Sequence, residues 1–158
     1  MFYFLHFVLQ VRVLKPGRYL LLIVEQLFLQ QAGEEQLHAL KLLSYVQKAG
    51  GSVKLGAIDA PPHEYASVFD VVQQTLEHER KVTRMIHDLV AQAEQDKDYS
   101  TRSYLQWFVD EQVEEEASFT ELLQLTKLAG DNFLMLEHRV ELLVQARMAA
   151  AAAAGPQG

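Results

Sequence analysis

The sequence contains no cysteine among its 158 residues. A disulfide scaffold and metal sites built on thiolates are therefore excluded, although a lack of cysteine does not fix a cellular compartment. Glycine and proline are also few, with eight and four residues, and they gather in a small number of places. Between these places Ala, Leu, Glu, Gln and Val dominate, and this composition favours helix over strand.

Basic residues are outnumbered, with 14 Lys and Arg against 21 Asp and Glu, for a formal net charge of −7. No stripe of basic residues is visible along the chain. Proteins that bind nucleic acid draw most of their affinity from neutralising phosphates. We therefore expect no nucleic-acid partner.

Long hydrophobic runs are missing as well. The two most apolar stretches, "MFYFLHFVL" at 1–9 and "YLLLIV" at 19–24, are separated by "KPG" at 15–17. Neither reaches the roughly 20 residues that a membrane-spanning helix needs. No basic residue precedes the first run and no small-residue cleavage site follows it, which argues against a signal peptide. We expect a cytoplasmic protein with no membrane partner.

Helical periodicity is what the chain does contain. Four segments between the breaks are predicted as helices, at 18–49, 68–95, 101–129 and 133–150. Ser67 is placed to cap the second helix, and Gly130 suits the end of the third. No strand pattern of any length is present. We expect one domain over 1–150, with an atypical N-terminal segment at 1–17 and a disordered tail at 151–158.

The connections between the predicted helices constrain the topology. About five residues join 68–95 to 101–129, which predicts antiparallel neighbours. The link at 49–67 could extend about 60 Å at ~3.3 Å per residue, whereas a helix of 28 residues is about 42 Å long. The helices on either side of this link can therefore be parallel. The predicted fold is all-α, a four-helix bundle with one long crossover and a short C-terminal fifth helix.

The side of each helix predicted to face the core is apolar at its ends and polar at its middle. Steps of three and four residues give Phe28, Gln31, Glu35, His38, Leu42 and Tyr45 on the first helix; Val68, Val72, Thr75, Glu79, Val82, Ile86, Leu89 and Ala93 on the second; and Leu105, Phe108, Gln112, Glu115, Phe119 and Leu122 on the third. These three sets of residues are called the core stripes below.

The polar residues of the core stripes are candidates for a metal site. They are Glu35, His38, Glu79, Gln112 and Glu115, and no Lys or Arg lies on any stripe. Buried carboxylates without compensation repel one another and have raised pKa values, which a bound cation relieves. A hard cation suits such an oxygen-rich set, with one imidazole nitrogen. A single acidic residue on one stripe can simply reach the solvent, but interruption of all three favours the metal site.

Other acidic residues lie beside the stripes. Glu34, Glu111 and Glu114 could form an adjoining acidic site along which a metal ion moves, or they could be a solvated helix flank; the spacing leaves both open. Asp110 and Glu116 are predicted to be ordinary solvated charges.

Three motifs and the crossover together resemble one known family. "FLQQAGEEQLHALKLLSYV" at 28–46, "LEHERKVT" at 76–83, "YLQWFVDEQVEEE" at 104–116 and "GGSVKLGAIDAPP" at 50–62 are similar to prokaryotic-type non-haem ferritin. The resemblance covers roughly 28–145. It implies a ferritin-like fold, iron storage in a hollow multi-subunit shell, and oxidation of Fe(II) by oxygen at a dinuclear centre.

The resemblance also implies roles for individual residues. Glu35 would bridge two irons, His38 would bind the first, and Glu79 and Glu115 would bind the second, with Gln112 close by. Glu34, Glu111 and Glu114 would form the third iron site of this branch. Since 111–115 supplies no second Glu-x-x-His pair, the pattern disfavours bacterioferritin, rubrerythrin and the di-iron oxygenases.

The N-terminus departs from the family. Residues 1–26 match no part of the family's first bundle helix, which carries a further Glu ligand for the first iron. An incomplete first helix is therefore expected, and ferroxidase activity depends on whether the site is complete. We expect a homo-oligomeric iron store. Two alternatives stay open: a structural subunit that co-assembles with complete ferritin chains, and a di-iron redox enzyme that is not a store.

Overall fold

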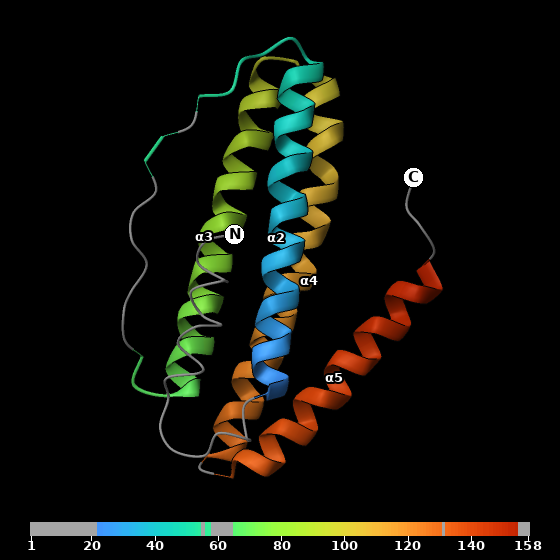
Figure 1. Ribbon diagram of the computed structural model, residues 1–158. Helices are drawn as coiled ribbons and strands as arrows, with labels where there is room; N and C mark the ends of the chain where they lie inside the picture. Colours follow the sequence, from blue (N-terminus) through green and yellow to red (C-terminus); the bar gives the residue numbers. More distant parts are fainter. Residues whose placement is uncertain (1–21, 55, 58–64, 131, 155–158) are drawn as a thin grey trace. The chain divides into compact units, whose positions relative to one another are not determined.

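All the regular structure that the computed structural model describes is α-helical (Figure 1). The described residues are 22–54, 56–57, 65–130 and 132–154. Their helices are α2 (Leu22–Lys48), α3 (Val68–Gln95), α4 (Tyr99–Ala129) and α5 (Phe133–Ala154). The predicted all-α class is confirmed. The "KPG" turn, the atypical segment at 1–17 and the expected incomplete first helix lie outside the described residues.

Local capping explains where α3 and α4 begin and end. Ser67 Oγ accepts a hydrogen bond from the Asp70 backbone N–H at 3.1 Å, as predicted for the start of α3. Helix α4 begins two residues earlier than predicted, because the Asp98 carboxylate accepts from the Thr101 N–H at 3.0 Å. Gly130 ends α4 with a φ of +51°, a backbone conformation that glycine adopts without steric cost.

Helix α5 is longer than predicted. It continues to Ala154 and so includes residues 151–154, which were expected to belong to a disordered tail. Alanine has the most favourable helix propensity of all residues, so a run of alanines after residue 148 continues the helix. The disordered tail expected at 151–158 stays a prediction, and residues 155–158 lie outside the described residues.

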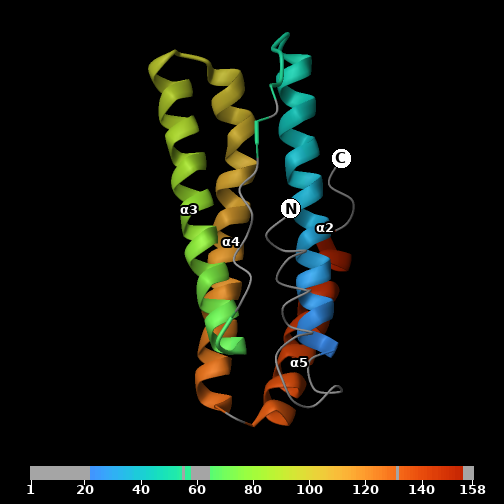
Figure 2. The same cartoon turned by 60° about the vertical axis from the view of Figure 1, so that its left-hand side comes forward.

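The chain forms two compact units, of which one is the stretch Ser67–Gly130 with α3 and α4. These two helices pack side by side along most of their length (Figure 2). The turn between them is short and contains Lys97 at a φ of +57°. Arg102 Nε and Glu94 Oε1, 3.1 Å apart, form an ion pair across the end of the hairpin. The predicted antiparallel pairing of these helices is confirmed.

The core stripes locate the buried residues of this unit well. All six stripe residues of α4 are buried, from Leu105 to Leu122. On α3, however, Leu89 is 49 % exposed although the stripe includes it. A strict seven-residue repeat drifts by about 20° per heptad against an ideal helix. Leu89 lies three heptads beyond Val68, so it has turned away from the core, whereas Ile86 and Ala93 remain buried.

The other unit contains α2 and α5, which pack against each other. Its buried apolar residues include Val24 and Phe28 of α2 and Leu136 and Val140 of α5. The Ile23 N–H, at the start of α2, donates to Glu137 Oε1 of α5 at 3.3 Å. Partial burial raises the pKa of the Glu137 carboxyl, and the neighbouring Glu141 raises it further, although hydrogen bonds from Ile23 and Val24 act in the opposite direction.

The crossover leaves α2 through a tight turn. Gly50 has a φ of +81°, and the Gly51 N–H donates to the Val46 carbonyl at 2.8 Å. The expected parallel direction of α2 and α3, and the expected single domain, stay predictions. Among the described helices, none is long and apolar enough to cross a membrane.

Candidate metal centre

Three polar residues interrupt the apolar core of the α3–α4 unit at mid-helix. Glu79 is only 1 % exposed, Gln112 4 % and Glu115 7 %. All three lie on the core stripes, so helical periodicity directs them inward together with Phe108 and Phe119. Burying a charged or amide side chain is costly unless hydrogen bonds or a bound ion compensate for the lost water.

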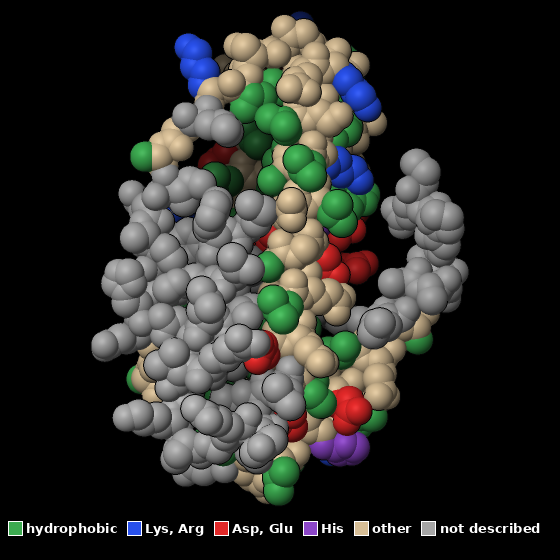
Figure 3. Space-filling model, viewed as in Figure 1, with side chains coloured by type: hydrophobic (Ala, Val, Ile, Leu, Met, Phe, Trp, Pro, Cys, Tyr) green, Lys and Arg blue, Asp and Glu red, His purple; other side chains and the backbone are tan. Residues whose placement is uncertain are grey.

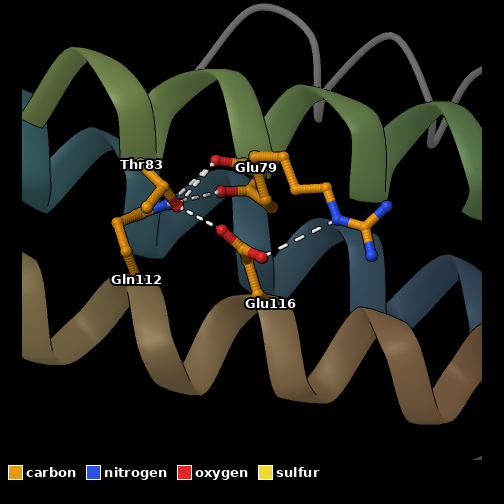
Figure 4. A network of polar contacts seen from close by, with 5 residues as sticks. Glu79, Thr83, Gln112 and Glu116 are labelled. Carbon is orange, nitrogen blue, oxygen red and sulfur yellow. Dashed lines mark hydrogen bonds and ion pairs between the residues drawn. The ribbon is translucent and has the colours of Figure 1, made fainter. Parts of the chain in front are cut away.

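Helix pairing brings two of these residues into direct contact (Figure 4). Gln112 Nε2 lies 3.3 Å from Glu79 Oε2 and 3.3 Å from the Glu79 backbone carbonyl. The amide of α4 therefore donates to the carboxylate of α3. The predicted proximity of Gln112 to a candidate metal ligand follows from the antiparallel register of the two helices.

A third partner of the amide was not predicted. Gln112 Nε2 also lies 3.3 Å from Thr83 Oγ1, and this hydroxyl lies 2.6 Å from Glu116 Oε1. Arg80 Nε completes the network at 3.7 Å from Glu116 Oε2. The polar network of Glu79, Arg80, Thr83, Gln112 and Glu116 thus joins α3 to α4.

The position of Glu116 corrects the sequence-based prediction. It was expected to be an ordinary solvated charge, whereas it is half-buried and accepts from Thr83. The prediction failed because the face of α4 that packs against α3 is wider than the core stripe alone. A spacing of four residues was the available signal, since it places Thr83 on the face of Glu79 and Glu116 on the face of Gln112. Asp110, by contrast, is exposed as predicted.

The two candidate ligands of α2 contact each other within their own helix. His38 Nδ1 lies 3.4 Å from Glu35 Oε1, and the two side chains are 14 % and 17 % exposed. Their i, i+3 spacing places them on one face, as predicted. A carboxylate and an imidazole side by side form an ion pair when the imidazole is protonated, and both can bind a metal when it is neutral.

A buried amide lies one turn before this pair. Gln31 is 2 % exposed, and within the described part of the chain its Oε1 has no hydrogen-bond partner. A buried acceptor without a donor is rare in folded proteins, and a cation or its bound water satisfies such an atom. Oxygen donors with one imidazole form a set that suits iron.

The flanking acidic residues differ in exposure. Glu34 is half-buried and accepts from Gln30 Nε2 at 2.9 Å. Glu111 is half-buried and Glu114 is exposed. In neither unit do the described residues alone contain a group of three or more Asp, Glu or His side chains able to hold a metal ion. A site that combines Glu35 and His38 with residues of α3 and α4 stays a prediction.

The known proteins to which this chain is similar belong to one group. A model of the family described as ferritin-like domain matches residues 21–129. A bacterial non-heme ferritin of Staphylococcus aureus is 40 % identical over 116 residues, which cover 73 % of this chain and 70 % of that protein. A probable bacterial non-heme ferritin-like protein of Haemophilus influenzae is 41 % identical over 101 residues, which cover 64 % of this chain and 61 % of that protein.

Solved structures extend the similarity to the fold. An open pore ferritin from the archaeon Archaeoglobus fulgidus is 34 % identical, with a TM-score of 0.82 over 90 % of this chain and 85 % of that one. A humanized archaeal ferritin is 32 % identical, with a TM-score of 0.81 over 90 % of this chain and 86 % of that one.

Proposed function

This chain belongs to the ferritin family, and from that premise we propose that it takes up Fe(II) and deposits it as a ferric mineral in a multi-subunit shell. The resemblance to prokaryotic-type non-haem ferritin and the ferritin-like four-helix fold class are confirmed. Membership of this family implies iron binding and supports iron storage.

One observation supports the proposal of a specific iron site more strongly than the other observations do. Helices α3 and α4 carry two buried carboxylates, Glu79 and Glu115, and a buried amide, Gln112, which donates to one of those carboxylates. Such oxygen donors match the preference of iron ions, and burial excludes competing water. We propose that Glu79 and Glu115 bind iron and that the Gln112 amide orients the Glu79 carboxylate.

The remaining roles are proposed from the family pattern. Glu35 would bridge two irons and His38 would bind the first of them. Glu34, Glu111 and Glu114 would bind a third iron at the edge of this centre. In oxidation, each Fe(II) loses one electron to oxygen and becomes Fe(III), which the carboxylates stabilise by their negative charge.

Assembly is proposed from the surface of the chain. Several large hydrophobic side chains are exposed, among them Leu37 at 66 %, Val113 at 67 %, Leu128 at 73 % and Leu134 at 73 %. Hydrophobic side chains also reach the surface at several levels along α2 (Figure 3). Surfaces of this kind are typical of interfaces between subunits. We propose that further copies of the chain cover them; co-assembly with complete ferritin chains and a cytoplasmic location stay predictions.

The test is iron loading of the purified full chain. Size-exclusion chromatography with light scattering gives the particle mass, and iron analysis after aerobic addition of Fe(II) gives the iron content per chain. A store takes up far more iron than its side chains can bind stoichiometrically. A monodisperse monomer, or an assembly that saturates at two or three irons per chain, would contradict storage, and the second result would favour a di-iron redox enzyme.

A further inference from the structure

The polar network between α3 and α4 contains one hydroxyl whose hydrogen has a defined place. Thr83 Oγ1 lies 2.6 Å from Glu116 Oε1 and 3.0 Å from the Glu79 backbone carbonyl. A threonine hydroxyl has a single hydrogen, and an ionised carboxylate can only accept. The shorter, charge-assisted contact is the stronger one, so the hydrogen goes to Glu116. The lone pairs of Thr83 Oγ1 are then free to accept from another donor.

This placement decides which end of the Gln112 amide faces inward. Three acceptors surround the amide at 3.3 Å: Glu79 Oε2, the Glu79 carbonyl oxygen and Thr83 Oγ1. An amide oxygen at that position would meet acceptors alone and would be repelled. Only the NH2 end fits. The side chain of Gln112 therefore directs its hydrogens at Glu79 because Thr83 and Glu79 both present oxygen to it.

We propose that Thr83, held in place by Glu116, is a positioning residue for the iron site: it fixes the Gln112 amide so that an amide hydrogen holds Oε2 of Glu79. This inference rests on the proposed function, in which Glu79 is an iron ligand. Thr83 does not touch iron. It acts through the amide, which restricts rotation of the Glu79 carboxylate and thereby sets the direction in which that carboxylate binds a metal.

The exposed end of the polar network, Arg80, contributes less to holding the Gln112 amide in place. Arg80 is half-exposed, and its Nε lies 3.7 Å from Glu116 Oε2. An ion pair at that distance and exposure is weak, because water screens it. The half-buried contact between Thr83 and Glu116 is the part of the network that holds the amide in place.

The helix offers a matched control for a test of this inference. Thr75 lies two turns before Thr83, is fully buried, and its hydroxyl donates to the Val71 carbonyl at 2.9 Å. Thr75→Val and Thr83→Val remove the same atoms from the same helix, but only Thr83→Val removes a partner of the amide. Thr83→Ser keeps the hydroxyl and loses only a methyl group.

The experiment measures Zn(II) affinity of the full chain by calorimetric titration, with Co(II) as a spectroscopic probe. Both metals bind carboxylate and imidazole ligands, and neither requires oxidation by oxygen. Glu79→Ala defines the binding that depends on Glu79. We expect Thr83→Val to weaken this binding about 10-fold, within the range typical for residues that orient ligands, and to shift the Co(II) absorption bands. Thr83→Ser and Thr75→Val should stay within about two-fold of the parent.

The possible outcomes separate this inference from the proposed function. If the parent chain shows no Glu79-dependent binding of either metal, the proposed iron site is wrong. If the parent binds but Thr83→Val matches it in affinity and Co(II) spectrum, Thr83 has no positioning role and only this inference fails. If Thr75→Val weakens binding as much as Thr83→Val, the effect is one of helix stability, and the inference is likewise overturned.

Discussion

The candidate ligands of the α3–α4 unit and those of the α2–α5 unit make different contacts. In the first, Gln112 and Glu116 of one helix bond to Glu79 and Thr83 of the other. In the second, the Glu35–His38 contact lies within a single helix. The α3–α4 pair thus holds its part of the candidate site by hydrogen bonds between two helices, and the two candidate ligands of α2 contact each other across one turn of the same helix.

Both units contain large apolar residues that are buried and others that are exposed; on α3 and α4 the exposed ones include Met85, Val113 and Leu128. On the core stripe of α4, Phe108 and Phe119 are 4 % and 1 % exposed. On α2 and α5, Leu40, Leu134 and Leu142 are between 45 % and 73 % exposed. Exposed apolar surface of this extent is typical of an interface with a partner.

Removing a buried aromatic residue of one unit and a partly exposed one of the other gives the largest expected difference. Phe119→Ala should lower the free energy of unfolding by about 3–5 kcal/mol, because it deletes a buried ring and leaves a cavity. Phe133→Ala, at a residue of α5 that is 37 % exposed, should cost less than about 1 kcal/mol. Denaturant unfolding of the metal-free chain measures both. Equal losses would show that Phe119 and Phe133 do not differ in packing as their exposed fractions indicate.

Loss of a candidate ligand from either unit tests whether both contribute to one site. Glu79→Ala and Glu35→Ala should each weaken Zn(II) binding by more than about 100-fold, because each removes a charged oxygen ligand rather than a residue behind it. Relief of repulsion between buried carboxylates should also stabilise the metal-free form. Calorimetric titration gives the affinity, with the exposed Asp110→Ala as control. Unchanged affinity in both variants would exclude the proposed ligands.

Substituting one helix cap in each unit gives a matched comparison with a smaller expected effect. Ser67 accepts from the Asp70 N–H at 3.1 Å in one unit, and Asn132 accepts from the Met135 N–H at 3.1 Å in the other. Ser67→Ala should cost about 1 kcal/mol of global stability. Asn132→Ala should mainly speed hydrogen exchange in the first turn of α5, since that helix is less covered. A global loss from Asn132→Ala as large as that from Ser67→Ala would contradict the comparison.

The smallest expected effects are two pH dependences of opposite sign. Burial raises the pKa of Glu137 above its ordinary 4.5, so its contribution to stability is complete below pH 4.5 and is lost as the pH rises through the folded-state pKa. The stability of the parent relative to Glu137→Gln should therefore fall from acid to neutral pH. The change should stay below about 1 kcal/mol because water screens a partly exposed group.

Asp98 should behave in the reverse way. Hydrogen bonds from the side chain and the backbone N–H of Thr101 lower its pKa below the ordinary 3.8. Its contribution is therefore present above pH 3.8 and is lost as the pH falls through the lower, folded-state value. As the pH rises from 2 to 5, the stability of the parent should increase relative to that of Asp98→Asn. Thermal unfolding across pH 2 to 7 measures the stability difference between the parent and each variant. If both stability differences change with pH in the same direction, this assignment is contradicted.

Local sequence determined where the helices lie and which residues of α4 face inward. Each of these features depends on residues within about one turn of each other: a cap such as Ser67, a stop such as Gly130, and a period of 3.6 that directs Glu115 and Gln112 to the core. Interactions of this range can be derived from the order of residues. Glu79, Gln112 and Glu115 were therefore found buried where periodicity placed them.

Tertiary structure alone decided the partners of these residues. Gln112 meets Glu79 across 33 positions of sequence, and the start of α2 meets Glu137 across 114. Glu116 was misassigned and Leu89 was wrongly expected to be buried, because the width and the drift of a packed face depend on the neighbouring helix. A periodic pattern specifies the direction of a side chain from its own helix axis, but only the register of the packed pair specifies which atom it reaches.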